Sequence, residues 1–95
     1  SLLFVPPAEG GGMEIIMSNY EKYLNVFVET FSISKEEAEN LEYQGIPAWD
    51  SVGHMGLIAA IEDTFDIMMD TDDIIDLSSF NIGKEILAGH YNIEF

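Results

Sequence analysis

The sequence of 95 residues contains no cysteine and no arginine, and only three lysines oppose its 18 aspartate and glutamate residues. Without cysteine, the chain has no disulfide, no thiolate metal site and no cysteine nucleophile. The net charge of −15 repels the phosphates of nucleic acids and anionic membrane surfaces, so we expect partners with basic surfaces and no nucleic acid. The same repulsion opposes self-association and favours a monomer.

The N-terminal segment also lacks the marks of a targeting sequence. Its apolar run, 2–5, is only four residues long and no basic residue precedes it, so we expect neither a signal peptide nor a membrane span. Residues 1–12 end in three glycines, and we interpret them as a tag remnant or disordered tail. Residues 13–95 suffice for one small domain, and the missing signals favour a cytoplasmic location.

The apolar content of 47% is typical of a folded domain, and its spacing is that of helices. A helix is predicted over 19–31, where Ser18 and Glu21 form a capping box. Its buried face comprises Tyr20, Tyr23, Leu24, Phe27, Val28 and Phe31. Ser34 and Glu37 repeat the capping pattern and predict a single short turn of helix inside a long connection. Pro47 ends any helix there.

Three further segments complete the predicted fold. Asp50 is a good N-cap for a helix over 51–65 with a buried stripe at Leu57, Ile58, Ile61 and Phe65. Thr71 can cap a short helix with Ile74, Ile75 and Leu77 as its apolar members. The last helix, over 80–89, is expected to bury Ile82, Ile86 and Leu87 and to end at Gly89. The prediction is therefore an all-α four-helix bundle, with three longer helices, one short helix and a long loop between the first two long ones.

The chemistry centres on Ser51, which lies in the first turn of the predicted second long helix and outside its apolar stripe. This position exposes the hydroxyl group. A helix N-terminus has unpaired N–H groups and the positive end of the helix dipole, so a phosphate attached there is tolerated. The simpler interpretation is a polar first-turn residue beside the capping Asp50, and for this pair alone the simpler interpretation prevails.

The residues after Ser51 extend the pattern over about thirty positions. Asp50-Ser51-Val52 begins a helix, an apolar stripe follows over 57–63, then Phe65-Asp66-Ile67, and then Asp72-Asp73-Ile74 with Leu77. With this order of features, the sequence resembles the acyl carrier protein family from Ser18 to Ile93. The small size, the acidity and the absence of cysteine agree with the resemblance.

The resemblance implies that Ser51 carries a 4′-phosphopantetheine arm, with Asp50 and His54 beside the cofactor. A phosphopantetheinyl transferase would attach the arm from coenzyme A with a divalent metal ion. The arm's thiol would hold an acyl intermediate as a thioester for acyl-loading and acyl-processing enzymes of a fatty-acid, polyketide or specialised acyl-transfer pathway. The protein itself is then expected not to be an enzyme.

Two further sets of residues follow from the resemblance. Those expected to contact partner enzymes are Val52, Met55, Gly56, Glu62, Asp63, Asp66, Asp72 and Asp73. Those expected to line an acyl pocket between the second long helix and the short helix are Ile58, Ile61, Met69, Ile74 and Leu77. Val52 replaces the usual leucine and Gly56 a frequent acid, so we expect a flatter, less charged patch and a specialised pathway.

Other interpretations remain open at this point. An aminoacyl or peptidyl carrier would use the same serine, and a cofactor-free acidic interaction module would use the seven acids between Glu62 and Asp76. These acids do not match a calcium-binding EF-hand loop, and two isolated histidines predict no metal site. Asp50, Ser51 and His54 suggest a hydrolase by residue type, but their closeness in sequence argues against a triad. Trp49 is expected to anchor the long loop.

Overall fold

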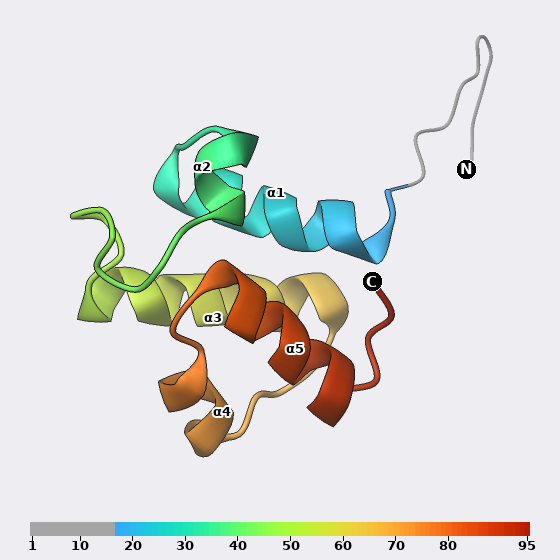
Figure 1. The fold of residues 1–95 in the computed structure, drawn as a ribbon. Helices are drawn as coiled ribbons and strands as arrows, with labels where there is room; N and C mark the ends of the chain where they lie inside the picture. The colour runs from blue at the N-terminus through green and yellow to red at the C-terminus, as the bar shows by residue number, and fades with distance from the viewer. Residues whose placement is uncertain (1–16) are drawn as a thin grey trace, which may run out of the picture.

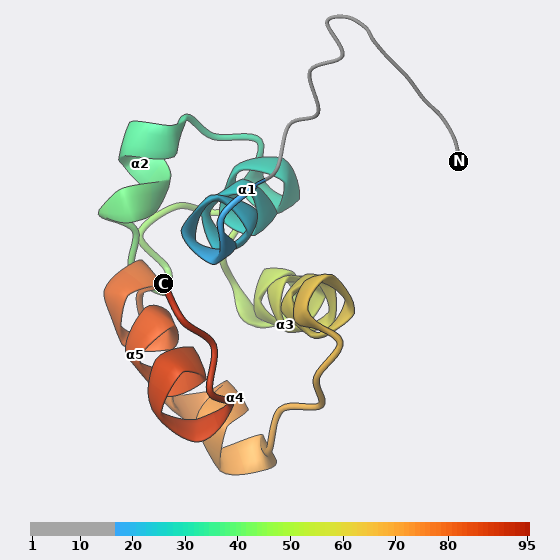
Figure 2. The same ribbon diagram turned by 90° about the vertical axis from the view of Figure 1, so that its right-hand side faces the viewer.

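The computed structural model describes residues 17–95, and this part of the chain folds into five helices (Figures 1 and 2). They are α1 (Asn19–Phe31), α2 (Lys35–Glu39), α3 (Ser51–Phe65), α4 (Thr71–Asp76) and α5 (Phe80–His90). The predicted all-α class is confirmed for these residues. The interpretation of 1–12 as a tag remnant or tail lies outside the described residues.

The helices surround one core. α1 packs chiefly against α3, and the two run in opposite directions (Figure 1). The short α2 packs against α1 and α5, while α4 packs against α5. The C-terminal end returns to the beginning of α1, where the Asn19 side-chain amide donates to the Glu94 carbonyl oxygen at 3.0 Å. None of the helices within 17–95 has the length and apolarity needed to cross a membrane.

The starts of α1 and α2 follow the sequence signals. Ser18 with Glu21, and Ser34 with Glu37, both form complete capping boxes. The predicted turn of helix after Ser34 is α2, which becomes a fifth helix beside the four of the predicted bundle. Capping residues satisfy backbone N–H groups that have no partner within the helix, so they locate a helix start from local sequence alone.

Two predictions about helix ends are wrong. Asp70, not Thr71, is the N-cap residue of α4, and its side chain makes no capping bond. α5 continues through Gly89 to His90, and the left-handed backbone conformation occurs at Asn92, with φ of 58°. Ile82, expected in the core, is 41% exposed, because α5 turns Phe80, Gly83 and Leu87 inward instead.

Aromatic rings from α1 and α5 form the centre of the core. Tyr23 and Phe27 are fully buried, and both rings lie about 5 Å from the ring of Phe80 at the beginning of α5. The Tyr23 hydroxyl donates to the Phe80 carbonyl oxygen at 2.7 Å, and burial raises the pKa of this hydroxyl. Such pairs add about 0.5–1.5 kcal/mol beyond the area they bury, which fixes α5 against α1.

The long connection between α1 and α3 is anchored by Trp49, as the sequence predicts. Its indole ring is fully buried, stacks on Phe31 and meets the edge of Phe27. Tyr43 N–H donates to the Ser78 carbonyl at 2.9 Å, within an isolated bridge that joins this connection to the segment before α5. The loop is therefore held from both sides, and it delivers the chain to the beginning of α3.

Two glycines in α3 have opposite surroundings. A side chain at Gly53 would overlap the carbonyl oxygen of Ala48, because the loop crosses closely over the first turn of the helix. Gly56 is exposed, and apart from its own helical turn no atom of residues 17–95 lies within 4 Å of where its side chain would be. Only a glycine at position 53 leaves room for the loop to cross the helix. At position 56, packing does not require a glycine.

The two glycines give a matched test. Gly56→Ala should raise the free energy of unfolding by about 1 kcal/mol, the difference in helix propensity between glycine and alanine. Gly53→Ala should lower the free energy of unfolding by about 1–3 kcal/mol, since the new methyl group displaces the loop. Urea denaturation followed by circular dichroism measures both, and equal effects of the two variants would contradict the close passage of the loop.

Candidate functional site

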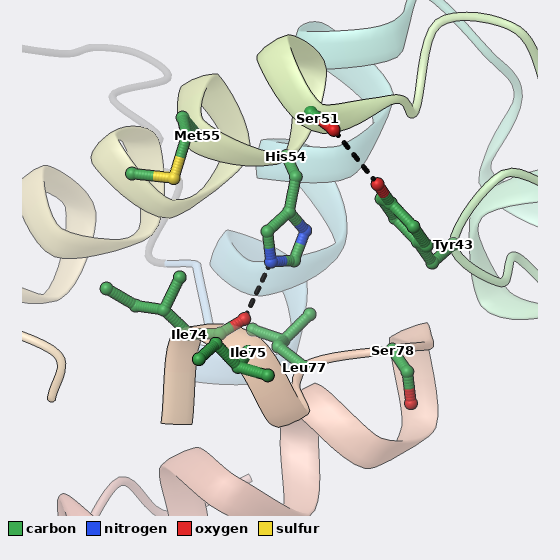
Figure 3. Close-up of a pocket in the computed structure, with 8 residues that line it drawn as sticks. All are labelled: Tyr43, Ser51, His54, Met55, Ile74, Ile75, Leu77 and Ser78. Atoms are coloured by element: carbon green, nitrogen blue, oxygen red, sulfur yellow. Dashed lines mark hydrogen bonds between the residues drawn. The ribbon is translucent and has the colours of Figure 1, made fainter. Parts of the chain in front are cut away.

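Ser51 is the first residue of α3, and its side chain is exposed. Its hydroxyl lies 3.4 Å from the hydroxyl of Tyr43, which comes from the long loop (Figure 3). Asp50 is the N-cap, as predicted, and its carboxylate accepts from Gly53 N–H at 2.8 Å. The carboxylate of Asp50 thus orients the first turn of α3, and the hydroxyl of Ser51 faces outward beside it.

The ring of His54, which the resemblance places beside the cofactor, forms hydrogen bonds within the protein instead. The ring is partly buried, and its Nδ1 accepts from the indole N–H of Trp49 at 2.9 Å. Because an indole N–H only donates, Nε2 carries the ring proton and donates to the Ile74 carbonyl oxygen at 2.7 Å. His54 therefore links the loop, α3 and α4, and neither ring nitrogen is free for a phosphate.

The same bonds bear on the triad arrangement. A Ser–His–Asp triad needs one ring nitrogen of the histidine at the serine hydroxyl and the other at the acid. Here His54 bonds Trp49 and Ile74, while the carboxylate of Asp50 bonds the backbone of α3. The three side chains are neighbours in sequence without triad geometry.

An apolar pocket of about 410 Å³ opens beside Ser51, between the first half of α3 and α4 (Figure 3). Its lining residues are Tyr43, Ser51, His54, Met55, Ile74, Ile75, Leu77 and Ser78. Two of the five predicted acyl-pocket residues, Ile74 and Leu77, are among them. Hydroxyl groups lie at the Tyr43 side, and the remaining surface is mostly hydrocarbon.

The other three predicted pocket residues are placed elsewhere, which corrects the prediction. Ile58, Ile61 and Met69 are buried in the main core and do not line this pocket. Ile58 and Ile61 lie on the helix that packs against α1, and α4 packs mainly against α5. Helical spacing showed that these residues are buried but not which neighbour they face.

Sequence reasoning also missed several lining residues. Tyr43 and Ser78 reach the pocket through the pairing of the long loop with the segment before α5, a long-range contact without a local signal. Ile75 was assigned to the apolar side of the short helix, yet 71% of it is exposed. The only sequence feature that pointed to Ile75 as a pocket residue is that it follows Ile74, which was expected to line the pocket.

The face of α3 next to Ser51 is largely uncharged. Val52 is 81% exposed and Met55 is 55% exposed, and Gly56, the residue after Met55, is also exposed. Of these three, Met55 also lines the pocket, together with the exposed Ile75 of α4. Val52 and Gly56, from which we expected a flatter patch, are thus both exposed on the helix that begins at Ser51.

The predicted acidic docking residues divide into two groups. Asp63, Asp66 and Asp72 are exposed, as a docking surface requires. Glu62 is partly buried, and its carboxylate accepts from Met69 N–H at 2.8 Å, which orders the turn after α3. Asp73 is a correction, because it is only 6% exposed and is held by the C-terminal end of α5.

The carboxylate of Asp73 accepts two hydrogen bonds. The Tyr91 hydroxyl donates to one oxygen at 2.7 Å, and His90 Nδ1 lies 2.8 Å from the other. The bond from Tyr91, followed by that from His90, lowers the pKa of Asp73 against the opposing effect of desolvation. Asp73 thus joins α4 to α5 in its charged form.

No group of three or more His, Asp or Glu side chains within 17–95 is arranged to hold a metal ion. Comparisons with family models, with curated proteins and with solved structures found no match to this chain. The site is therefore interpreted from its own residues.

The Asp73 contacts predict how stability changes with acid. A carboxyl whose pKa is lowered by folding stabilises the protein above its unfolded value of about 4, and this contribution disappears as the pH falls through the lower folded value. Asp73→Asn should therefore destabilise the protein at pH 7, and the difference from wild type should shrink below pH 4. Urea denaturation at both pH values measures it.

Asp72→Asn is the matched control, since Asp72 is the exposed neighbour in the same first turn of α4. Two results would contradict the role of the buried carboxylate. One is an equal loss of stability in both variants at pH 7, and the other is a loss of stability in Asp73→Asn that does not shrink in acid.

Proposed function

We propose that this chain is a carrier protein that holds acyl intermediates on a 4′-phosphopantetheine arm attached to Ser51. The observation that carries the proposal is the exposed Ser51 hydroxyl at the first residue of α3, beside an apolar pocket. The order of three longer helices with a long first connection and the short acidic α4 supports an architecture of the acyl-carrier type.

The residues around Ser51 suit attachment of a phosphate. The hydroxyl would lose its proton and form a P–O bond to the phosphate next to pantetheine in coenzyme A, while the pyrophosphate bond breaks and adenosine bisphosphate leaves. The free N–H groups of the first turn of α3 favour the added negative charge. The Tyr43 hydroxyl, 3.4 Å from that of Ser51, is placed to donate a hydrogen bond to it. When bound, the arm supplies a thiol that holds the acyl group as a thioester.

The surroundings suit contact with several enzymes in turn. Exposed Val52, Met55 and Gly56 form an apolar patch next to Ser51, and Asp63, Asp66 and Asp72 supply negative charge further along. Opposite charges on a partner speed encounter, and their effect weakens with salt. This combination favours short-lived contacts, which a carrier requires.

The carried group is proposed to be acyl, not aminoacyl. The pocket beside Ser51 is lined mainly by Met55, Ile74, Ile75 and Leu77. A hydrocarbon chain gains free energy by leaving water for such a surface, whereas an ammonium group there would lose hydration without a partner.

The proposal is tested by the intact mass of the protein before and after incubation with coenzyme A, magnesium and a broad-specificity phosphopantetheinyl transferase. We expect the wild type to gain the mass of one phosphopantetheine and Ser51→Ala to gain none. Ser78→Ala is the matched control, because this serine lines the same pocket but is not at a helix start, and it should be modified like wild type.

Folding of each variant is checked by circular dichroism. A folded wild type that gains no mass with this transferase, or a Ser51→Ala variant that still gains it, would contradict the proposal. In the first case, a cofactor-free acidic interaction module would become the better interpretation.

A further inference from the structure

The pocket beside Ser51 is small and apolar. Its volume of about 410 Å³ is near the lower end of the roughly 300–1,000 Å³ typical of small-molecule sites. Its hydrocarbon surface suits an acyl chain better than the arm itself, since the amide groups of pantetheine would need hydrogen-bond partners there.

The pocket also has a closed inner wall. Leu77 lines it and is only 1% exposed, so its side chain separates the pocket from the core. Ile58, Ile61 and Met69, which would line a deeper cavity, are buried in the main core instead. Further methylenes of a longer chain could therefore be buried only if α4 moved away from α3.

His54 opposes this movement. Its Nε2 donates to the Ile74 carbonyl oxygen of α4 (Figure 3). Its Nδ1 accepts from the fully buried Trp49. α4 has six residues, no side-chain cap, and packs mainly against α5. The bond from His54 is thus a principal tie between α3 and α4, and it sets the width of the pocket between them.

We propose that this site accepts a short acyl chain, such as butyryl or hexanoyl, and that His54 is the specificity-determining residue that limits chain length. The inference rests on the proposed carrier function for the origin of the acyl group. The proposed limit on the length of the acyl chain rests on the size of the pocket and on the hydrogen bonds of His54.

The test uses the unmodified protein, so it does not depend on the transferase. Methyl groups of isoleucine, leucine and methionine are followed by NMR during titration with butyryl, hexanoyl and decanoyl thioesters of N-acetylcysteamine, which mimic the loaded end of the arm. We expect shifts at Met55, Ile74, Ile75 and Leu77, and none at Ile58, Ile61 and Met69.

Affinity against chain length gives the decisive result. Each methylene that enters an apolar site raises affinity roughly four-fold. For wild type, we expect this rise to stop at hexanoyl, so that decanoyl binds within about two-fold of hexanoyl. A rise that continues to decanoyl, or equal shifts with pantetheine lacking an acyl group, would overturn the inference.

Two variants test the role of His54. In His54→Ala, α4 loses its tie, so decanoyl should bind at least roughly ten-fold more tightly than hexanoyl, as expected for added buried methylenes. In His54→Gln, the side-chain amide can still donate to the Ile74 carbonyl, so the wild-type limit should return. A folded His54→Ala variant with the wild-type limit would overturn the role of His54. A folded His54→Gln variant whose affinity rises through decanoyl would overturn it as well, and this result does not depend on whether His54→Ala folds.

Failure here differs from failure of the carrier function. If Ser51 gains the arm but affinity rises through decanoyl, only the chain-length limit is wrong. If Ser51 gains no arm, the carrier function is wrong whatever the titration shows.

Discussion

The burial of the Trp49 indole is the interaction on which the site depends. The segment between α2 and α3 contains no helix. Its position therefore depends on the Trp49 ring, which packs on Phe27 and Phe31. A buried indole removes a large apolar area from water and leaves one N–H that needs a partner. That partner is His54, so the packing of the loop also sets the orientation of the histidine beside the pocket.

The short helix α4 depends on similar contacts. A helix of six residues is not stable alone, because few hydrogen bonds offset the cost of its first turn. Both histidines of the chain contact it at consecutive residues, His54 at the Ile74 carbonyl and His90 at the Asp73 carboxylate. One contact comes from α3 and the other from α5. The pocket wall is therefore held from two sides by side chains distant in sequence.

The acidic residues have two different structural roles. Asp50, Glu62 and Asp73 accept hydrogen bonds that fix a helix start, a turn and a helix contact. The exposed acids remain hydrated and give the surface its charge. The composition showed the charge but not this division, since the burial of Asp73 depends on Tyr91, which lies 18 residues further along.

The sequence by itself determined the all-α class, the capped starts of α1, α2 and α3 and the place of Ser51 at the beginning of α3, because helical spacing and capping act within a few residues. Only the tertiary structure decided the rest of the site. The pocket lies next to Tyr43 and Ile75, and not over Ile58, because the long loop pairs with the segment before α5 and α4 packs on α5. Such contacts join residues far apart in the chain, and no local pattern encodes which partners meet.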